Sequence, residues 1–320
     1  MGFTKKSFFK KIWLKFIDKP EYKRYKNSLN YHRGIEHDLK RLSDYVATNE
    51  IFYLEKIKQH ALSGSMINFS HSGNAGDIIY SLPSLKSISE ALGIPVRLFL
   101  KLNQPLDLPD GFSHPLGNVM LNNAMASMLL PLLKQQAYLN DCQILKDEPI
   151  LVDLDTVRKS GIKLDRGSIA RWYSYITGGP VSLSTPWLQV QANIDYSETI
   201  IIARSSRYQN RLIDYTFLNK YDRLAFVGVE SEFLDLKRMI PTLEWVQVLN
   251  FLELAQIIAG CKFFIGNQSF PFSIAEGLKV PRILETYVDA PNVIPEGSQG
   301  FDFYFQEHFE SVVARLNSLN

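Results

Sequence analysis

At 320 residues the chain is longer than one hydrophobic core usually serves, so two domains of ordinary size are expected. Its 46% hydrophobic and 21% charged residues are typical of a folded protein and exclude an intrinsically disordered chain. The net charge is only +2, but residues 1–28 hold nine lysines and arginines against two acids. The positive charge is therefore concentrated at the N-terminal end.

This basic segment has the periodicity of an amphipathic helix. Its large apolar side chains share one helical face: Phe9, Ile12, Trp13, Phe16 and Ile17. The other side carries Lys10, Lys11 and Lys15. Two interpretations stay open: a helix lying in the headgroup layer of an anionic membrane, or a helix docked on its own domain or on a partner. Nucleic acid is not an expected partner, because the rest of the chain is acidic and has no recognised nucleic-acid module.

The rest of the composition limits the location and the chemistry. No apolar run reaches the ~20 residues that span a bilayer, and lysines interrupt any signal-peptide core. A cytoplasmic protein, with the basic segment able to reach the inner face of a membrane, is expected. Cys142 and Cys261 are far apart and lack a neighbouring histidine cluster, so neither a disulfide nor a zinc site is predicted, and no cofactor is expected.

In chain order, a basic helical extension is predicted over residues 1–62, with Ile35, Leu39, Leu42 and Val46 continuing a helical period. An N-terminal Rossmann-like domain is predicted over 63–185. It begins with a β-loop-α-β unit: strand 66–69, loop 70–76, helix 77–92 and strand 96–100. An irregular stretch (103–117), a helix (122–138) and a strand (150–154) follow.

Residues 177–197 are rich in Gly, Ser and Pro and predict a linker. The C-terminal Rossmann-like domain is predicted over 186–320. Its expected strands are 199–203, 223–227, 245–248, 263–265 and 282–284. Its expected helices are 212–220, 230–239, 251–260 and 270–279, the third opened by a capping box of Asn250 and Glu253. In such a doubly wound domain, ligands bind beyond the carboxyl ends of the strands.

The most informative turn is Gly266-Asn267-Gln268-Ser269, between a buried strand and a helix that has Pro271 in its first turn. A helix N-terminus of this kind attracts phosphate through its unpaired N–H groups and its dipole. The alternative is that Ser269 only caps the helix and Asn267 only shapes the turn.

Residues 263–281 resemble the C-terminal donor-site signature of the ADP-heptose:lipopolysaccharide heptosyltransferases, strand-Gly-Asn-Asp-Ser-Gly-Pro-x-His-x-Ala followed by Gly-x-Pro. Residues 251–260 are similar to the helix before that signature. Independently, residues 76–85 resemble the family's N-terminal segment, Gly-Asp-(apolar)₂-x-x-Leu-Pro-(small)-Leu. The resemblance covers roughly residues 65–100 and 199–290. It implies a GT-B architecture, in which two Rossmann-like domains face a cleft with the acceptor on the N-terminal side and the sugar nucleotide on the C-terminal side.

The resemblance also implies roles for particular residues. Asp77 matches the family's proposed general base, although a first-turn acid of a helix would look the same in sequence. The loop before it, with His71, Asn74 and Gly76, is expected on the acceptor side.

On the donor side, Arg204 and Arg207 follow the first strand of the second domain and are expected to neutralise the diphosphate. Glu276 is a candidate for the ribose hydroxyls. The other expected donor contacts are Gln247 and Asn250 near the base and Asn267, Gln268, Ser269 and Phe270 at the turn. Where the family has Asp, Gly and His, this chain has Gln268, Phe270 and Ser273, which speaks against heptose as the sugar.

The function predicted from these residues is an inverting, metal-independent transfer of a sugar from a nucleotide diphosphate sugar to a glycan or lipid-linked acceptor. The principal alternative is a degenerate GT-B binding or scaffold protein, indicated by the three departures. A minor alternative is a metal-dependent GT-A enzyme, in which Asp153 and Asp155 would hold the metal as an Asp-x-Asp pair.

Overall fold

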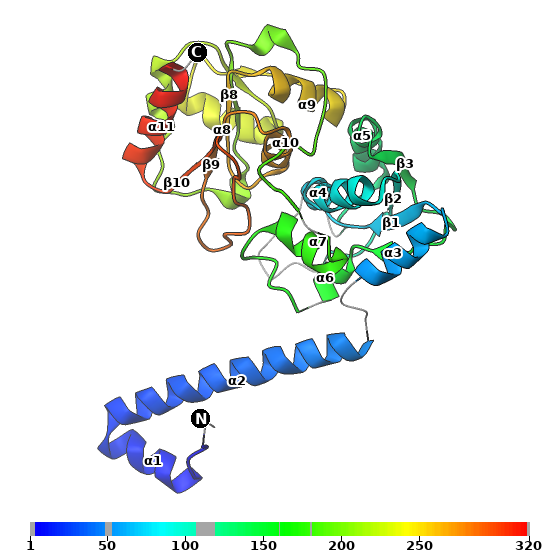
Figure 1. Ribbon diagram of the computed structural model, residues 1–320. Coiled ribbons are helices and arrows are strands. Elements are labelled where there is room, and N and C mark those ends of the chain that lie inside the picture. The colour runs from blue at the N-terminus through cyan, green and yellow to red at the C-terminus, as the bar shows by residue number, and fades with distance from the viewer. Residues whose placement is uncertain (1–3, 49–52, 107–118, 160, 180, 319–320) are drawn as a thin grey trace. The chain divides into compact units, whose positions relative to one another are not determined.

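The computed structural model describes residues 4–48, 53–106, 119–159, 161–179 and 181–318 (Figure 1). The chain divides into two compact units. The smaller unit consists of Met1–Ile51 with Thr156–Ile162, and the larger unit consists of Phe52–Asp155 with Lys163–Asn320. Most of the predicted irregular stretch over residues 103–117 lies outside the described residues.

The smaller unit is helical, with α1 (Phe8–Ile17), α2 (Lys19–Thr48) and α6 (Thr156–Lys159). Ser7 caps α1 by accepting a hydrogen bond from the Lys10 amide, and Asp18 accepts one from Glu21 at the start of α2. Leu14 and Tyr25 are buried where the two helices pack against each other. In the described residues, no helix has both the length and the apolar composition needed to cross a bilayer.

The first sheet of the larger unit has four parallel strands in the order β3-β2-β1-β4. Their bounds are β1 Ile67–His71, β2 Val96–Leu100, β3 Leu139–Ile144 and β4 Val152–Asp153. The helices around this sheet are α3 (Leu54–Leu62), α4 (Ala75–Leu92), α5 (Asn123–Lys134) and α7 (Ile169–Thr177). Helix α4 ends as predicted at Gly93, which takes the left-handed conformation with φ 67°.

The second sheet has six parallel strands in the order β10-β9-β8-β5-β6-β7. The strands are β5 Ile200–Ala203, β6 Leu224–Phe226, β7 Glu244–Trp245, β8 Phe263–Gly266, β9 Arg282–Glu285 and β10 Gly300–Phe303. The α-helices of this region are α8 (Glu230–Met239), α9 (Phe251–Gly260), α10 (Phe270–Leu278) and α11 (Gln306–Ser318). Short 3₁₀ helices lie at Ile194–Tyr196 (η1), Ser206–Tyr208 (η2) and Thr216–Lys220 (η3).

Two helix pairs join the sheets: α4 packs against α10, and α5 packs against α9 (Figure 1). Parallel strands that are buried on both faces have continuous apolar sequences. Strands β5 (Ile-Ile-Ile-Ala) and β8 (Phe-Phe-Ile-Gly) are of this kind, and every one of their residues is buried. The predicted strands and helices of this half are largely confirmed. The predicted helix over 212–220 is wrong in type and extent, since only the 3₁₀ helix η3 forms there.

The predicted boundaries at residues 62 and 185 remain predictions. Helix α3, placed by the sequence in the N-terminal extension, lies within the larger unit. Its Ile57 is buried, and the amide of Tyr53 at its start donates to the carbonyl of Ile176 at the end of α7.

Candidate functional site

The predicted acceptor loop connects the carboxyl end of β1 with the first turn of α4. His71 ends β1 and is fully buried, with Nε2 2.8 Å from the Tyr173 hydroxyl and Nδ1 accepting from the Gly73 amide at 2.8 Å. Asp155 accepts from the Ser72 amide at 3.0 Å. Two side chains thus hold two successive amides of this loop. His71 supports the backbone of the loop rather than lining an open surface.

Asp77 lies in the first turn of α4 and is half-buried. The N-cap of the helix is Asn74, whose side chain makes no capping hydrogen bond. Its Oδ1 atom is buried and has no hydrogen-bond partner among the described residues. A buried acceptor without a partner is rare in folded proteins. Among the described residues of this loop, Asn74 is the one with such a side-chain atom.

The start of α4 lies against the start of α10. A Cβ atom built on Gly76 would be 3.9 Å from the Phe270 Cα and 3.9 Å from the Ser273 Oγ. Since α4 follows β1 and α10 follows β8, two helix N-termini meet where one strand of each sheet ends. The arrangement brings the predicted base Asp77 and the predicted phosphate turn to one place.

Asn267 fastens the turn to the loop after β5. Its Oδ1 accepts from the Ser205 amide at 3.0 Å, and its Nδ2 donates to the carbonyls of Ser205 and Tyr208 at 2.6 and 3.0 Å. Gly266 precedes it at a close approach of backbones, where a Cβ would lie 2.9 Å from the Ala203 carbonyl oxygen. Both amide hydrogens of Asn267 are used within the protein, so this residue shapes the turn.

Gln268 fastens the turn on its other side. Its Nε2 donates to the Ala290 carbonyl and to Asn292 Oδ1, both at 2.7 Å, and its Oε1 accepts from the Tyr287 amide at 3.1 Å. An aspartate could accept from the amide but could not donate to two oxygens. The departure from the family signature at this position is explained by these contacts.

Ser269 and Phe270 open α10. Ser269 is the N-cap residue, but its side chain makes no capping hydrogen bond and is 3.4 Å from the Asn267 carbonyl. The ring of Phe270 packs on Phe251 of α9, with ring centroids 4.3 Å apart. Ser273, which stands where the family has histidine, is buried and donates to the Phe270 carbonyl at 2.6 Å.

The two predicted arginines have different surroundings. Arg204 is buried and forms a two-point ion pair with Glu285, with Nε and Nη2 at 2.7 and 2.8 Å from the carboxylate oxygens. Its guanidinium lies over the Tyr215 ring at 4.4 Å. Arg207 is exposed on η2. Of the two, Arg207 has the cation that an incoming diphosphate can reach without breaking a buried pair.

A carboxylate that the sequence did not single out lies beside Arg207. Glu232, in the first turn of α8, accepts from the Ser206 amide at 3.0 Å. Burial raises the pKa of Glu232 above its usual range. The hydrogen bond from the Ser206 amide and the charge of Arg207 act in the opposite direction but do not cancel this rise. The distance along the chain between residues 206 and 232 left no sequence signal for this contact.

Glu276 is almost fully buried in the second half of α10. Its carboxylate forms ion pairs with Lys279 and Arg282 and also accepts from the Glu296 amide at 3.1 Å. Both carboxylate oxygens therefore have partners within the protein, and a contact of Glu276 with a ribose stays a prediction.

Gln247 is exposed in the segment between β7 and α9. Asn250 confirms the predicted capping box: its Oδ1 accepts from the amides of Leu252 and Glu253 at 2.9 and 3.1 Å, and Glu253 accepts from the Leu249 amide at 2.7 Å. The side-chain oxygen of Asn250 is thus committed to the helix, and a contact with a nucleotide base would fall to its Nδ2.

The two carboxylates of the Asp-x-Asp pair at the end of β4, Asp153 and Asp155, both form ion pairs with one lysine. Lys101 donates to Asp153 at 2.6 Å and lies 2.5 Å from Asp155. Burial raises the pKa of Asp155, but His71, Lys101 and Ser72 outweigh it and lower that pKa to about 2. In the described part of the chain, no group of three or more metal-ligating side chains is present. The two parallel sheets match the GT-B fold rather than the GT-A alternative.

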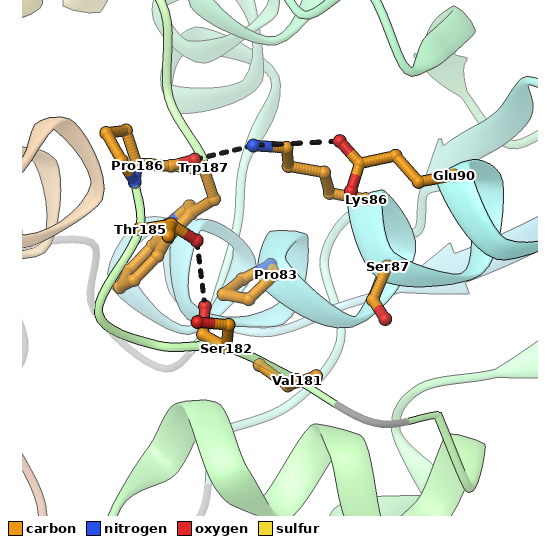
Figure 2. A pocket seen from close by; sticks show the side chains of 9 residues that line it. All are labelled: Pro83, Lys86, Ser87, Glu90, Val181, Ser182, Thr185, Pro186 and Trp187. Carbon is orange, nitrogen blue, oxygen red and sulfur yellow. Dashed lines mark hydrogen bonds and ion pairs between the residues drawn. The ribbon is translucent and has the colours of Figure 1, made fainter.

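A hollow of about 570 Å³ lies between the second half of α4 and residues 181–187 (Figure 2). In Figure 2, Lys86 crosses it to donate to the Pro186 carbonyl at 2.7 Å and lies 3.8 Å from Glu90. None of the predicted site residues lines this hollow. Its lining residues therefore differ from those at the place where the starts of α4 and α10 meet.

Comparison with solved structures supports the two-domain fold. The heptosyltransferase WaaC of E. coli, solved with ADP, superposes with a TM-score of 0.52 at 10% identity, over 79% of this chain and 100% of that chain. The E. coli ADP-heptose lps heptosyltransferase II gives a TM-score of 0.50 at 12% identity, over 79% and 98%. No protein-family model matches the sequence, and no curated protein matches it either.

The fold is therefore that of the GT-B glycosyltransferases, as the resemblance predicted. Within that class, the two neighbours named above are heptosyltransferases, and this chain shares their fold.

Proposed function

We propose that this chain is a glycosyltransferase that moves a sugar from a nucleotide diphosphate sugar to a glycan or lipid-linked acceptor, with inversion, in the cytoplasm. The observation that supports it best is the meeting of the α4 and α10 N-termini at the carboxyl ends of one strand of each sheet, where a Cβ atom on Gly76 would lie 3.9 Å from the Phe270 Cα. Ligands of doubly wound domains bind at such edges. WaaC, a structural neighbour, was solved with ADP.

In this proposal, residues 63–185 bind the acceptor and residues 186–320 bind the donor. The Asp77 carboxylate takes the proton of the acceptor hydroxyl while that oxygen attacks the anomeric carbon. The bond from this carbon to the diphosphate oxygen breaks, and the nucleoside diphosphate leaves with the electron pair. Arg207 and the amides at the start of α10 stabilise the charge that develops on it. Arg204 acts as a positioning residue, because its ion pair with Glu285 fixes the loop that carries Arg207.

Nucleoside diphosphates are expected to bind the turn formed by Asn267–Phe270. Arg207→Gln should weaken this binding about tenfold or more, because a charge-assisted hydrogen bond contributes ~1.5–3 kcal/mol. Isothermal titration calorimetry with a panel of nucleoside diphosphates measures both effects. Arg238→Gln is the matched control, since Arg238 is also an exposed arginine, on α8, and its ion-pair partner is the nearby Asp235. Absence of binding at millimolar nucleotide, or a crystal structure with the nucleotide away from this turn, would refute the pocket.

Turnover is expected to survive chelation, because Arg207 and the helix terminus supply the positive charge at the diphosphate. Activity is measured after dialysis against EDTA, with and without added manganese. Asp155→Asn provides a second measurement, since Asp155 is the acid that a metal would need. Loss of activity in EDTA, restored by manganese and abolished in that variant, would contradict the metal-independent mechanism.

A second candidate is a degenerate GT-B binding or scaffold protein. It is favoured by the turn itself, where Asn267, Gln268 and Ser273 all use their side chains within the protein. The two candidates differ in one readout: a binding protein takes up a nucleoside diphosphate in calorimetry but releases none from a nucleotide sugar when acceptor is supplied.

A further inference from the structure

Helix α1 has one buried position and one broad exposed side. Leu14 is buried against α2, and the hairpin is held by Lys6, whose Nζ pairs with Glu21 at 3.0 Å and whose amide donates to the Tyr25 hydroxyl at 3.2 Å. These contacts place one face of α1 toward α2. The remaining faces carry most of the large apolar side chains of the segment.

Six large apolar side chains of α1 are 42% to 82% exposed: Phe8, Phe9, Ile12, Trp13, Phe16 and Ile17. An α-helix turns by about 100° per residue, so these six positions cover about half of the helix circumference. Leu14 lies on the opposite side. These six residues, four of which are aromatic, form the aromatic face of α1. A contiguous apolar surface of this kind is uncommon on a soluble protein and indicates an interaction site.

Basic side chains border the aromatic face on both edges. At about 100° per residue, Lys15 lies beside Phe8 at one edge of this face, and Lys10 lies beside Ile17 at the other edge. Both lysines are exposed. Residues 1–28 contain only two acids. Glu21 is paired with Lys6 and Arg24, and Asp18 accepts from the Glu21 amide. The free charge around the aromatic face is therefore almost entirely positive.

We infer that the aromatic face of α1 docks on an anionic lipid membrane. Aromatic and aliphatic side chains partition into the boundary between headgroups and acyl chains, while lysines at both edges reach the anionic headgroups. A groove on a protein partner would match the apolar side chains, but it gives no reason for cations along both edges and almost no acids nearby. The surface is distinct from the sugar-transfer site, so it can be tested without activity.

The test is flotation of the full-length protein with vesicles of phosphatidylcholine alone or mixed with phosphatidylglycerol. The protein is expected to float with the mixed vesicles and to be released in part by salt. Each lysine near an anionic surface contributes ~1 kcal/mol, so Lys10→Gln with Lys11→Gln and Lys15→Gln should lower partitioning roughly a hundredfold. Trp13→Ser with Phe16→Ser should lower it at every salt concentration, because this component is apolar.

The matched control is Ile194→Ser with Leu212→Ser, which removes two apolar side chains of similar exposure from the larger unit. This variant should float like the unchanged protein. Equal flotation of the Trp13/Phe16 variant and the control overturns the inference. So does a protein that ignores vesicles but self-associates through this face in analytical ultracentrifugation. Because nucleotide binding is measured separately in solution, failure here leaves the proposed sugar transfer intact, and the reverse also holds.

Discussion

Asp77→Asn is expected to lower the turnover number by roughly 10²- to 10⁴-fold while leaving nucleoside diphosphate affinity nearly unchanged. The amide has the shape of the carboxylate but cannot accept the proton of an attacking hydroxyl. Asp77 lies one residue from Gly76, the point where α4 approaches α10, so a base at this position can reach a hydroxyl next to a donor held by the α10 turn.

The measurement is steady-state kinetics beside calorimetry on the same preparations. Asp77 is also a first-turn acid, so its loss costs ~0.3–1 kcal/mol of helix-dipole stabilisation. Glu307→Gln is the matched control: Glu307 is a first-turn acid of α11, and the same dipole effect there should leave turnover unchanged. Wild-type turnover in Asp77→Asn would reduce Asp77 to a helix-start residue.

The regular part of the fold could be predicted because its signals are local. Helices α8 and α9 begin and end at the predicted residues, since an apolar period marks each of them and Asn250 caps the start of α9. The edge strand β3 was missed. Its sequence, Leu-Asn-Asp-Cys-Gln-Ile over Leu139–Ile144, lacks the regular alternation of a strand, and the prediction continued the preceding helix to residue 138. Its pairing with β2 is a tertiary interaction that no local pattern encodes.

The C-terminal elements β10 and α11 were also missed, although α11 supplies Phe309, which stacks on Phe303 with centroids 3.9 Å apart. The buried residues of α11 are Phe309, Val312, Val313 and Leu316, which have the i, i+3, i+4, i+7 spacing of an amphipathic helix, so a local signal for this helix was present in the sequence.

The candidate site was predicted at the level of loops rather than contacts. The turn after β8 and the loop after β1 do come together. The partners of Gln268 could not be predicted, because they lie 19 to 24 residues further along the chain. Glu276 pairs with Lys279 and Arg282, which are close in sequence, but no pattern indicated that these charges are buried together. A glutamate within an apolar helix, such as Glu276, reads in sequence as a ligand contact or as a buried ion pair, and only burial separates the two.

Glu285→Ala is expected to lower the free energy of unfolding by about 3–5 kcal/mol, because removing one partner of a buried ion pair leaves an uncompensated charge. Glu285 is fully buried and accepts from Arg204, from the Asn210 amide at 2.5 Å and from the Tyr215 hydroxyl at 2.9 Å. All three donors belong to the segment after β5, so the variant should also loosen the loop that carries Arg207 and weaken nucleotide binding.

Urea unfolding measures the loss, and two further variants sharpen it. Asp235→Ala breaks the exposed pair with Arg238 and should cost under about 1 kcal/mol, since surface pairs contribute little. Arg204→Met combined with Glu285→Leu removes both buried charges and should recover part of the loss, because the cost comes mainly from the stranded guanidinium. If Glu285→Ala costs no more than Asp235→Ala, the pair with Arg204 is not what holds this loop. In that case the loop must be held by its other contacts, the hydrogen bonds of Asn267 from the α10 turn and the hydrogen bond from the Ser206 amide to Glu232.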